Sequence, residues 1–329
     1  MTAAPVRSIP APTLAQVQLA AQRIRNDVLR TPLVRYQGDP GEPEIWLKLE
    51  NLQPIGSFKL RGAMTRVAGV PRSLLGGGLY TASAGNMAQG VAYAARLLGV
   101  PASVVVPDSA PATKLAAVER LGASIVRVPY DEWWTTMKEH GRADMPGIFV
   151  HPFADTEVMA GNGTIALEIL DELEDVDTIL VPWGGGGLTC GIAAAARAMR
   201  PGIRVIACEV EGSAPLSASL RAGRPLAIEN QRSFIDGIGG KGVFPEMWPC
   251  AQQLVSGALT TTVGEVAEAV RLLAQRAHIV AEGAGAAALA VARGGLGALT
   301  PMPKRIVCIV SGGNIDAAIL ASILSGAVP

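Results

Sequence analysis

Short apolar strand-like runs alternate with Ala-rich helical runs through most of this chain, and this alternation limits the folds open to it. Between residues 78 and 151, four strand-like runs alternate with three helical runs. A second alternation extends from residue 161 to the C-terminus, with strand-like runs at 178–181, 205–209 and 305–310. The connections are short and marked by Gly or Pro, as parallel β–α units require. We therefore expect an α/β protein built on two doubly wound open sheets.

Three further stretches have less regular patterns. Residues 13–29 carry apolar side chains at helical spacing, with Thr13 in a capping position. Residues 44–49 have the pattern of a strand, and a helix is expected to begin near Lys59. Residues 212–258 are less regular, with Gly237, Gly239, Gly240 and Gly242 clustered.

Composition argues against several classes of protein. The 329 residues have a formal net charge of +0 and no long basic block, so nucleic acid is not expected as a partner. No apolar run reaches the ~18 residues that a membrane-spanning helix needs. Residues 1–12 lack the apolar core of a signal peptide and are expected to form a loose arm. The four cysteines lie far apart without metal-ligand spacing, which indicates buried thiols in a cytoplasmic protein.

Four consecutive glycines follow the strand-like run at 178–181 and precede a helical run: Gly184, Gly185, Gly186 and Gly187. A plain turn seldom needs more than one or two glycines. Backbone N–H groups gathered at the start of a helix can surround a phosphate, and that role explains all four. No Gly-Lys-Ser/Thr sequence follows, so the loop is not a Walker loop. The sequence favours a phosphate site over a purely structural loop.

Four other segments indicate chemistry only in combination. Lys59 has small residues on both sides, yet a surface lysine is the commoner case. Ser83–Asn86 and Ser311–Asn314 each join a strand to a helix, where caps are commoner than ligand sites. Glu282 stands beside glycines near a helix start, where a surface carboxylate is the commoner case. With the glycine loop, these segments supply an amine, a carboxylate site, a partner for a ring nitrogen and a phosphate site. Pyridoxal 5′-phosphate and an amino acid together need all four.

These segments also carry a family resemblance. Gly56-Ser57-Phe58-Lys59-Leu60-Arg61-Gly62-Ala63, Ser83-Ala84-Gly85-Asn86-Met87-Ala88-Gln89-Gly90, Gly184–Leu188 and Ser311–Asn314 resemble the motifs of fold-type II pyridoxal-phosphate enzymes. Among these, the chain is most similar to the serine/threonine dehydratases (threonine ammonia-lyases), with serine racemase as a close relative. The resemblance extends from about Leu14 to Leu324.

The resemblance implies an architecture. The fold would be the tryptophan-synthase-beta-like fold type II, with a small domain inserted into a large one and closing over the substrate. The large, cofactor-binding domain would comprise residues 1–55 and 156–329, and the small domain residues 56–155. The protein would be a cytoplasmic homodimer. The regulatory domain of biosynthetic threonine dehydratases has no room in this sequence, so feedback inhibition of that kind is not expected.

The resemblance also implies roles for single residues. Lys59 would bond to the cofactor aldehyde and act as the base at Cα of the substrate. The other cofactor-binding residues would be Phe58 beside the ring, Asn86 at the ring hydroxyl, Ser311 at the ring nitrogen, Glu282 near ring and substrate, and Gly184, Gly185, Gly186, Gly187 and Leu188 at the phosphate. The substrate would meet Ser83, Ala84, Gly85, Asn86, Met87 and Phe153.

The chain departs from the family pattern at several of these positions. Met87 replaces a usual His, and Trp183 replaces a smaller residue, so both are expected to reshape the pocket. Racemases have a serine as second acid or base where this chain has Ala84, and tend to have Asn at Phe153, so racemisation is disfavoured. Glu209 matches one ligand of the family's divalent-cation site. A proline, Pro215, stands where a second acidic ligand belongs, so no metal is expected.

The expected activity is β-elimination of water from L-threonine, L-serine or both, giving 2-oxobutanoate or pyruvate plus ammonia. This is a carbon–nitrogen lyase reaction of type EC 4.3.1.19. The alternatives are a related lyase acting on hydroxyaspartate or phenylserine, and a serine racemase. His140 and His151 are expected to be structural or solvated, and Trp133 and Trp134 to be packing residues.

Overall fold

The computed structural model describes residues 7–329, and it corrects the expected N-terminal arm. Residues 1–6 of that arm lie outside the described residues. Within the rest, Ile9 is buried and its amide donates to the Glu246 carbonyl at 3.1 Å. The Pro10 carbonyl accepts from the Thr156 hydroxyl at 2.8 Å. The expectation of a loose arm is therefore wrong for residues 9 and 10, which pack on the body of the protein.

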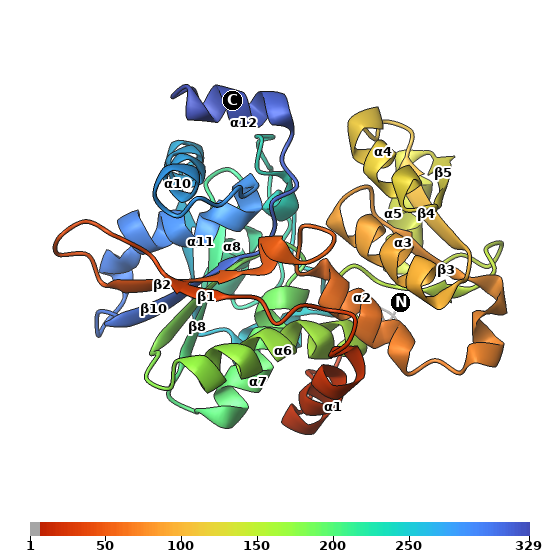
Figure 1. Cartoon of the computed structure of the whole chain (residues 1–329), viewed down its shortest axis with the longest axis horizontal. Coiled ribbons are helices and arrows are strands. Elements are labelled where there is room, and N and C mark those ends of the chain that lie inside the picture. The colour runs from red at the N-terminus through yellow and green to blue at the C-terminus, as the bar shows by residue number, and fades with distance from the viewer. Residues whose placement is uncertain (1–6) are drawn as a thin grey trace.

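The larger of two sheets has six strands in the order β1-β2-β10-β7-β8-β9 (Figure 1). Its strands are β1 (Leu33–Arg35), β2 (Glu44–Leu49), β7 (Thr178–Pro182), β8 (Arg204–Val210), β9 (Gly257–Thr261) and β10 (Arg305–Val310). All neighbours run parallel except β1, which is antiparallel to β2. Apart from the edge strand β1, this is the arrangement that repeated β–α units produce.

The smaller sheet has four parallel strands in the order β5-β4-β3-β6 and lies on the right of Figure 1. Its strands are β3 (Leu79–Ala82), β4 (Ala102–Pro107), β5 (Ser124–Val128) and β6 (Ile148–Phe149). The expected α/β class with two parallel-sheet units is confirmed. The exact domain boundaries, 56–155 against the remainder, stay a proposal, which the confinement of this sheet to residues 79–149 supports.

Helices cover both faces of the large sheet because successive side chains of a strand point to opposite faces. On one face, Ile179 and Val181 pack with α1, α6 and α7 in one apolar core. On the other face, Leu180 joins a second core with α10 and α11. The helices of this unit are α1 (Leu14–Ile24), α6 (Thr156–Glu172), α7 (Gly187–Met199), α8 (Pro215–Ala222), α9 (Trp248–Leu254), α10 (Val263–Arg276), α11 (Gly283–Gly294) and α12 (Ala317–Leu324).

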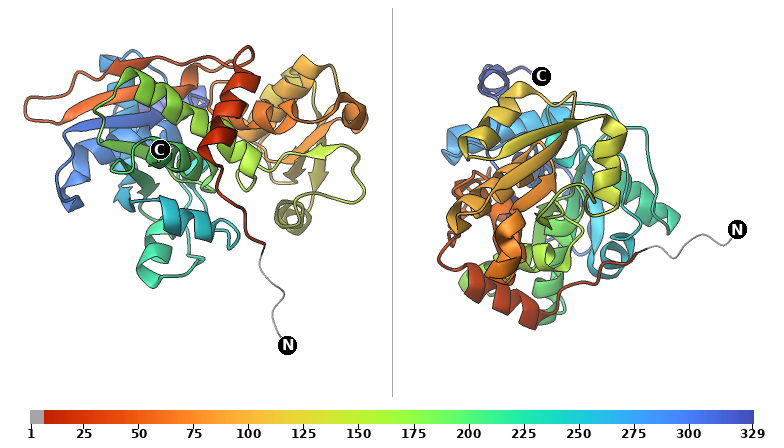
Figure 2. Two further views of the ribbon diagram at one scale, coloured as in Figure 1. Left: turned by 90° about the horizontal axis from the view of Figure 1, so that it is seen from below. Right: turned by 90° about the vertical axis from the view of Figure 1, so that its right-hand side faces the viewer.

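The remaining helices belong mainly to the smaller unit and are α2 (Lys59–Ala68), α3 (Asn86–Leu98), α4 (Ala112–Arg120) and α5 (Tyr130–Lys138). α2 packs on both α3 and α6, so it bridges the two units. The apolar helix α12 lies at the top of Figure 1 and of the right-hand view of Figure 2, where it packs on α10 through Ile323. No helix within residues 7–329 is long and apolar enough to cross a membrane.

The structure extends the pattern seen in the sequence at two places. α6 begins at Thr156, where the Asp155 carboxylate accepts from the Glu157 and Val158 amides, five residues before the expected start of the second alternation at residue 161. Gly161 and Gly163 suggest a helix break but instead allow neighbouring helices to approach closely. The stretch 212–258, expected to be irregular, contains α8 and α9 and leads into β9.

The crossing of α6 and α7 depends on Gly191, and this gives a first prediction. A Cβ at residue 191 would overlap the Met159 carbonyl oxygen and lie 3.1 Å from the Gly163 nitrogen. Gly191→Ala should therefore lower the free energy of unfolding by about 1–3 kcal/mol, as overpacked sites do. Urea denaturation followed by circular dichroism measures this.

The matched control is Gly202→Ala, since, its chain neighbours aside, no atom of residues 7–329 lies within 4 Å of a Cβ built at that turn. Its free energy of unfolding should change by no more than about 0.5 kcal/mol. Equal effects of the two substitutions would contradict the close packing of α6 on α7.

Candidate active site

A cavity of about 860 Å³ lies where the strands of the two sheets end. β3, β7 and β10 lead at their carboxyl ends into the segments that begin at Ser83, Gly184 and Ser311. Ligands of open α/β sheets bind at this edge. All the site residues expected from the sequence line this one cavity: Phe58, Lys59, Ser83, Ala84, Gly85, Asn86, Met87, Phe153, Gly184, Gly185, Gly186, Gly187, Leu188, Glu282 and Ser311.

Lys59 is the first residue of α2, and the backbone before it is fixed to the end of β10. Ser57 forms an antiparallel bridge with Gly312. The Phe58 amide donates to the Ser311 carbonyl at 3.0 Å, and the Gly313 amide donates to the Gly56 carbonyl at 2.9 Å. We call this pairing of residues 56–58 with 311–313 the backbone clamp. It sets the position of Lys59 relative to the large sheet.

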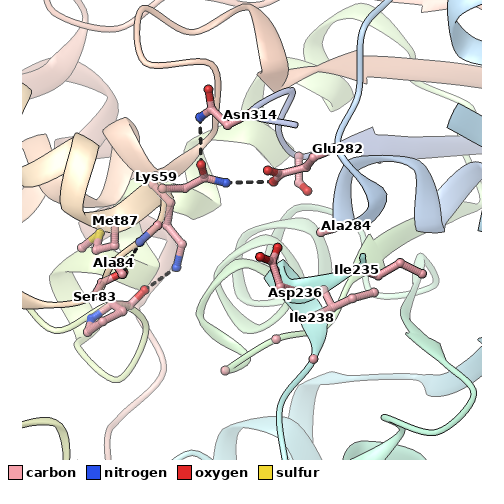
Figure 3. A pocket seen from close by; sticks show the side chains of 18 of the residues that line it. Lys59, Ser83, Ala84, Met87, Ile235, Asp236, Ile238, Glu282, Ala284 and Asn314 are labelled. Atoms are coloured by element: carbon pink, nitrogen blue, oxygen red, sulfur yellow. Dashed lines mark hydrogen bonds between the residues drawn. The ribbon is translucent and has the colours of Figure 1, made fainter. Parts of the chain in front are cut away.

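The Lys59 ammonium points into the cavity (Figure 3). Nζ donates to the Pro152 carbonyl at 2.6 Å and lies 5.1 Å from the centre of the Phe58 ring. Burial lowers the pKa of Lys59 to about 8, and the Glu282 carboxylate opposes this shift. A lysine with such a pKa is partly unprotonated near neutral pH and can act as a nucleophile or base.

A buried charge network holds α2 from its other side. The Arg61 guanidinium is 1% exposed and forms paired hydrogen bonds with both oxygens of Glu50, each at 2.8 Å. It also bonds both oxygens of Glu168, at 2.6 and 2.9 Å. Lys48 Nζ lies 2.6 Å from Glu168, so two cations face two carboxylates. Bidentate contacts of this kind offset the desolvation of the charges and fix the helix in one orientation.

The glycine loop Gly184–Gly187 has the close contacts that exclude side chains. Gly186 has φ +93°, and a Cβ there would lie 2.6 Å from the Trp183 ring. A Cβ at Gly185 would overlap the carbons of the Phe153 ring, and one at Gly187 would lie 2.7 Å from the Phe153 carbonyl oxygen. The loop leads into the N-terminus of α7, whose first amides have no intrahelical partner. It is therefore suited to a phosphate.

The turn Ser83–Asn86 leads into α3 without a side-chain cap. The N-cap residue is Gly85, and among the described residues no side chain accepts from the first amides of the helix. The Ser83 hydroxyl instead accepts from the Gly85 amide at 3.3 Å. The sequence alone favours an ordinary helix cap at this turn, and the described part of the structure has none at α3. The first amides of α3 are therefore open to a carboxylate in the cavity.

Asn86 links the two sides of the cavity. Its amide nitrogen donates to Glu282 at 2.8 Å, and its oxygen accepts from the Asn314 amide group at 2.8 Å. Figure 3 shows Glu282 and Asn314 on the same side of the cavity, with hydrogen bonds leading from each. The surface placement that Glu282 suggests on its own is wrong, because this residue is half-buried and lines the cavity.

The structure places three residues at which the chain was compared with the family pattern, Met87, Trp183 and Glu209. Met87 is buried at the start of α3 and lines the cavity. Trp183 lies outside the cavity lining and packs against Gly186. Its expected effect on the pocket is therefore corrected to an effect on the glycine loop. The buried Glu209 carboxylate accepts from the Leu216 and Ser217 amides at 2.7 and 2.8 Å, as a cap of α8.

The sequence did not indicate two parts of the cavity. The Pro152 carbonyl carries no side-chain signal that could have revealed it. The turn Asp236–Ile238 lines the wall opposite Lys59, with the Gly237 carbonyl 2.9 Å from a Cβ built at Gly184 (Figure 3). The cluster of glycines at 237–242 was the signal in the sequence that could have indicated this wall, because close approach of two backbones favours glycine on both.

Known proteins resemble this chain over most of its length. Residues 24–312 match the family described as "Pyridoxal-phosphate dependent enzyme". An L-threonine ammonia-lyase of Thermotoga maritima is 37% identical in sequence, and the match covers 95% of this chain and 78% of the relative. An L-threonine ammonia-lyase of Geobacter sulfurreducens is 40% identical, and the match covers 91% of this chain and 75% of the relative. The structure of maize serine racemase superposes with a TM-score of 0.88 at 29% identity, covering 96% of this chain and 98% of the racemase.

The cavity fits pyridoxal phosphate on its own geometry. A lysine of lowered pKa points into it, and a glycine loop whose Cβ positions are blocked forms one wall. The buried Ser311 lines it at the end of β10 and offers a hydroxyl as a partner for a ring nitrogen. The volume of about 860 Å³ also leaves room for an amino acid. The individual contacts of the expected residues with the cofactor stay predictions.

The glycine loop gives the second prediction. A methyl at residue 185 would overlap the Phe153 ring, so Gly185→Ala must displace either the ring or the loop. We expect the affinity for pyridoxal phosphate to fall about tenfold or more, which corresponds to about 1.4 kcal/mol. Titration of the cofactor-free protein by absorbance measures it.

Gly264→Ala serves as the control, because a Cβ there meets only the Thr262 hydroxyl, at 3.9 Å. This variant should bind the cofactor as the parent protein does. Unchanged affinity in Gly185→Ala would remove the loop from the cofactor site.

Proposed function

Since the chain belongs to the family of pyridoxal-phosphate-dependent enzymes, we propose that it is a threonine/serine ammonia-lyase. It would eliminate water from L-threonine, L-serine or both, and hydrolysis of the resulting enamine would give 2-oxobutanoate or pyruvate plus ammonia. The observation that carries the proposal is the placement of Lys59 between the glycine loop and the uncapped turn Ser83–Asn86, in one cavity. The two relatives reported above, both named L-threonine ammonia-lyase, support the choice of substrate.

The cofactor, when bound, supplies an electron sink for the charge that develops at Cα of the substrate. Lys59, the loop Gly184–Leu188 and Ser311 would hold it. A serine at the ring nitrogen is a weaker acid than an aspartate and leaves the sink less strong. Such a sink suits elimination, in which charge at Cα is relieved at once by departure of the β-hydroxyl.

The residues of the chain divide the remaining work. The free amides at the start of α3 would bind the substrate carboxylate, because the positive end of a helix favours an anion. Lys59 would take the proton from Cα, a task for which a pKa of about 8 is suitable. The Pro152 carbonyl, 2.6 Å from Nζ, would orient the amine during this transfer.

A racemase needs a second proton carrier on the side of Cα opposite to the lysine. The resemblance to maize serine racemase raises this alternative. The residue at the corresponding place is Ala84, whose methyl group lines the cavity and cannot carry a proton. This residue favours elimination over racemisation.

A lyase acting on a larger β-hydroxy amino acid is the second candidate. The wall of the cavity contains Phe153, Met87 and Trp133, and these side chains could contact a larger β-substituent such as that of phenylserine. The exposed Arg232 and Lys241 at the rim could meet the second carboxylate of hydroxyaspartate. The choice between these substrates depends on turnover rates.

Two further features of the family are proposed for this chain, a homodimeric assembly and a cytoplasmic location. The apolar sequence of α12 supports the first, because Ala317, Ala318, Ala321 and Leu324 are exposed in the single chain. Closure of the unit formed by residues 56–155 over the substrate is proposed with them. α2, packed on both units, would be the element next to the hinge.

The third prediction concerns Lys59. Lys59→Ala should abolish the long-wavelength absorption of the bound cofactor and lower 2-oxo acid formation from L-threonine by about 10²–10⁴-fold, the usual contribution of a general base. Lys138→Ala, which removes an exposed lysine of α5, is the control and should retain both properties. An active Lys59→Ala enzyme would end the proposal.

The same assay with L-serine, hydroxyaspartate and phenylserine distinguishes the candidate substrates. Fastest turnover of threonine or serine supports the ammonia-lyase proposed here. Fastest turnover of a larger substrate would replace the substrate while leaving the role of Lys59 in place.

A further inference from the structure

His151, the residue before Pro152, accepts two backbone hydrogen bonds at one ring nitrogen. His151 lies after β6 and is 1% exposed. Its Nδ1 accepts from two backbone amides, that of Phe153 at 3.2 Å and that of Ala154 at 2.8 Å. These two bonds close a tight turn over residues 151–154. The turn presents the Pro152 carbonyl to Lys59 Nζ and places the Phe153 ring against the glycine loop.

An imidazole nitrogen that accepts hydrogen bonds carries no proton, so the neutral His151 has its hydrogen on Nε2. This atom is buried and has no hydrogen-bond partner among the described residues. Burial lowers the pKa of His151 well below its ordinary value of 6.5, and repulsion by His140, Lys59 and Arg7 adds to this. A weak interaction with the Met137 backbone, which lacks the geometry of a hydrogen bond, opposes the shift. Geometry and surroundings both hold the ring neutral.

His140 and Glu246 complete a cluster with His151. The His140 ring stacks on the His151 ring at 4.4 Å, and its Nε2 lies 2.9 Å from the Glu246 carboxylate. The three residues are close enough to ligate a metal ion. A metal-bound histidine normally donates its other N–H to an acceptor, whereas Nδ1 of His151 faces two donors. The cluster therefore does not have the hydrogen bonds of a metal site.

We propose that His151 is the positioning residue for Lys59. The neutral ring accepts two amide hydrogens at one nitrogen and so fixes the turn 151–154. This turn fixes the Pro152 carbonyl, which orients the Lys59 amine. It also fixes the Phe153 ring, which covers the glycine loop. His151 contacts neither the cavity nor the reacting atoms, so it acts through Pro152 and Phe153. The proposal rests on the proposed function only in taking Lys59 as the reacting amine.

The proposal has a definite dependence on pH. A proton on Nδ1 would remove both acceptor bonds, because the protonated ring is a donor at each nitrogen. The unfolded chain binds this proton more readily than the folded one, so the contribution of His151 to stability is complete above pH 6.5 and is lost as pH falls toward the lower pKa of the folded state. The turn itself should open in the folded protein only when pH reaches that lower pKa.

Hydrogen exchange of the Phe153 and Ala154 amides in the holoenzyme tests the proposal without relying on turnover. In His151→Ala both amides should exchange about tenfold faster or more, the equivalent of one lost hydrogen bond, while amides of α10 keep their rates. In His151→Asn the side-chain oxygen lies near the place of Nδ1 and should restore protection. kcat should fall in the alanine variant with a smaller change in KM and recover in part in the asparagine variant.

His140→Gln is the matched control, because it removes the neighbouring ring without removing the acceptor of the two amides. It should leave their exchange unchanged. If His151→Ala does not fold, the parent protein and His151→Asn still decide the question. After correction for intrinsic exchange, acid should remove protection at residues 153 and 154 only in the parent protein.

Parent-like exchange in His151→Ala, or equal acid sensitivity of the parent and His151→Asn, would overturn the proposal. Should no β-hydroxy amino acid be turned over while the exchange results hold, the substrate proposal fails and the role of His151 stands.

Discussion

The backbone clamp between residues 56–58 and 311–313 is the contact on which the arrangement of the site depends. It fastens the start of α2 to the end of the central strand β10, so Lys59 and Ser311 are placed relative to each other by backbone hydrogen bonds at 2.9 and 3.0 Å. Backbone bonds of this kind do not depend on side-chain rotamers. In the proposed roles, the cofactor would meet the Lys59 amine at one end and the Ser311 hydroxyl at its ring nitrogen, and a fixed separation of the two residues would suit it.

Two cationic side chains in the first turn of α2, Lys59 and Arg61, have opposite electrostatic surroundings. Lys59 is surrounded by few compensating charges, and burial lowers the pKa of its amine to about 8. Two residues later, Arg61 is fully buried but held by two carboxylates. The compensated charge stabilises the orientation of the helix, while the poorly compensated one provides a reactive amine. The Pro152 carbonyl, fixed by His151, gives that amine its direction.

The sequence predicted those parts of the site that demand particular residue types. The Lys59 amine, the four glycines and the two Ser–Asn turns can be recognised from residue type alone. The alternation of strands and helices predicted that they lie together at the carboxyl ends of the strands. Contacts made by backbone atoms were not predictable in the same way, as the Pro152 carbonyl shows. The start of α6 was missed because Gly161 and Gly163 suggest a break, whereas the Asp155 cap and helix packing decide the boundary. The turn Asp236–Ile238 reaches the cavity only through long-range packing.

The most direct test of the central claim is to locate the lysine that reacts with pyridoxal phosphate. The cofactor-free protein is incubated with the cofactor at a series of pH values, treated with borohydride to make the bond permanent, and digested for mass spectrometry. The structure predicts that the added mass resides on the peptide that contains Lys59 and that the initial rate of labelling rises through about pH 8, as the amine loses its proton. Labelling of a different lysine, with the Lys59 peptide unmodified, would contradict the account.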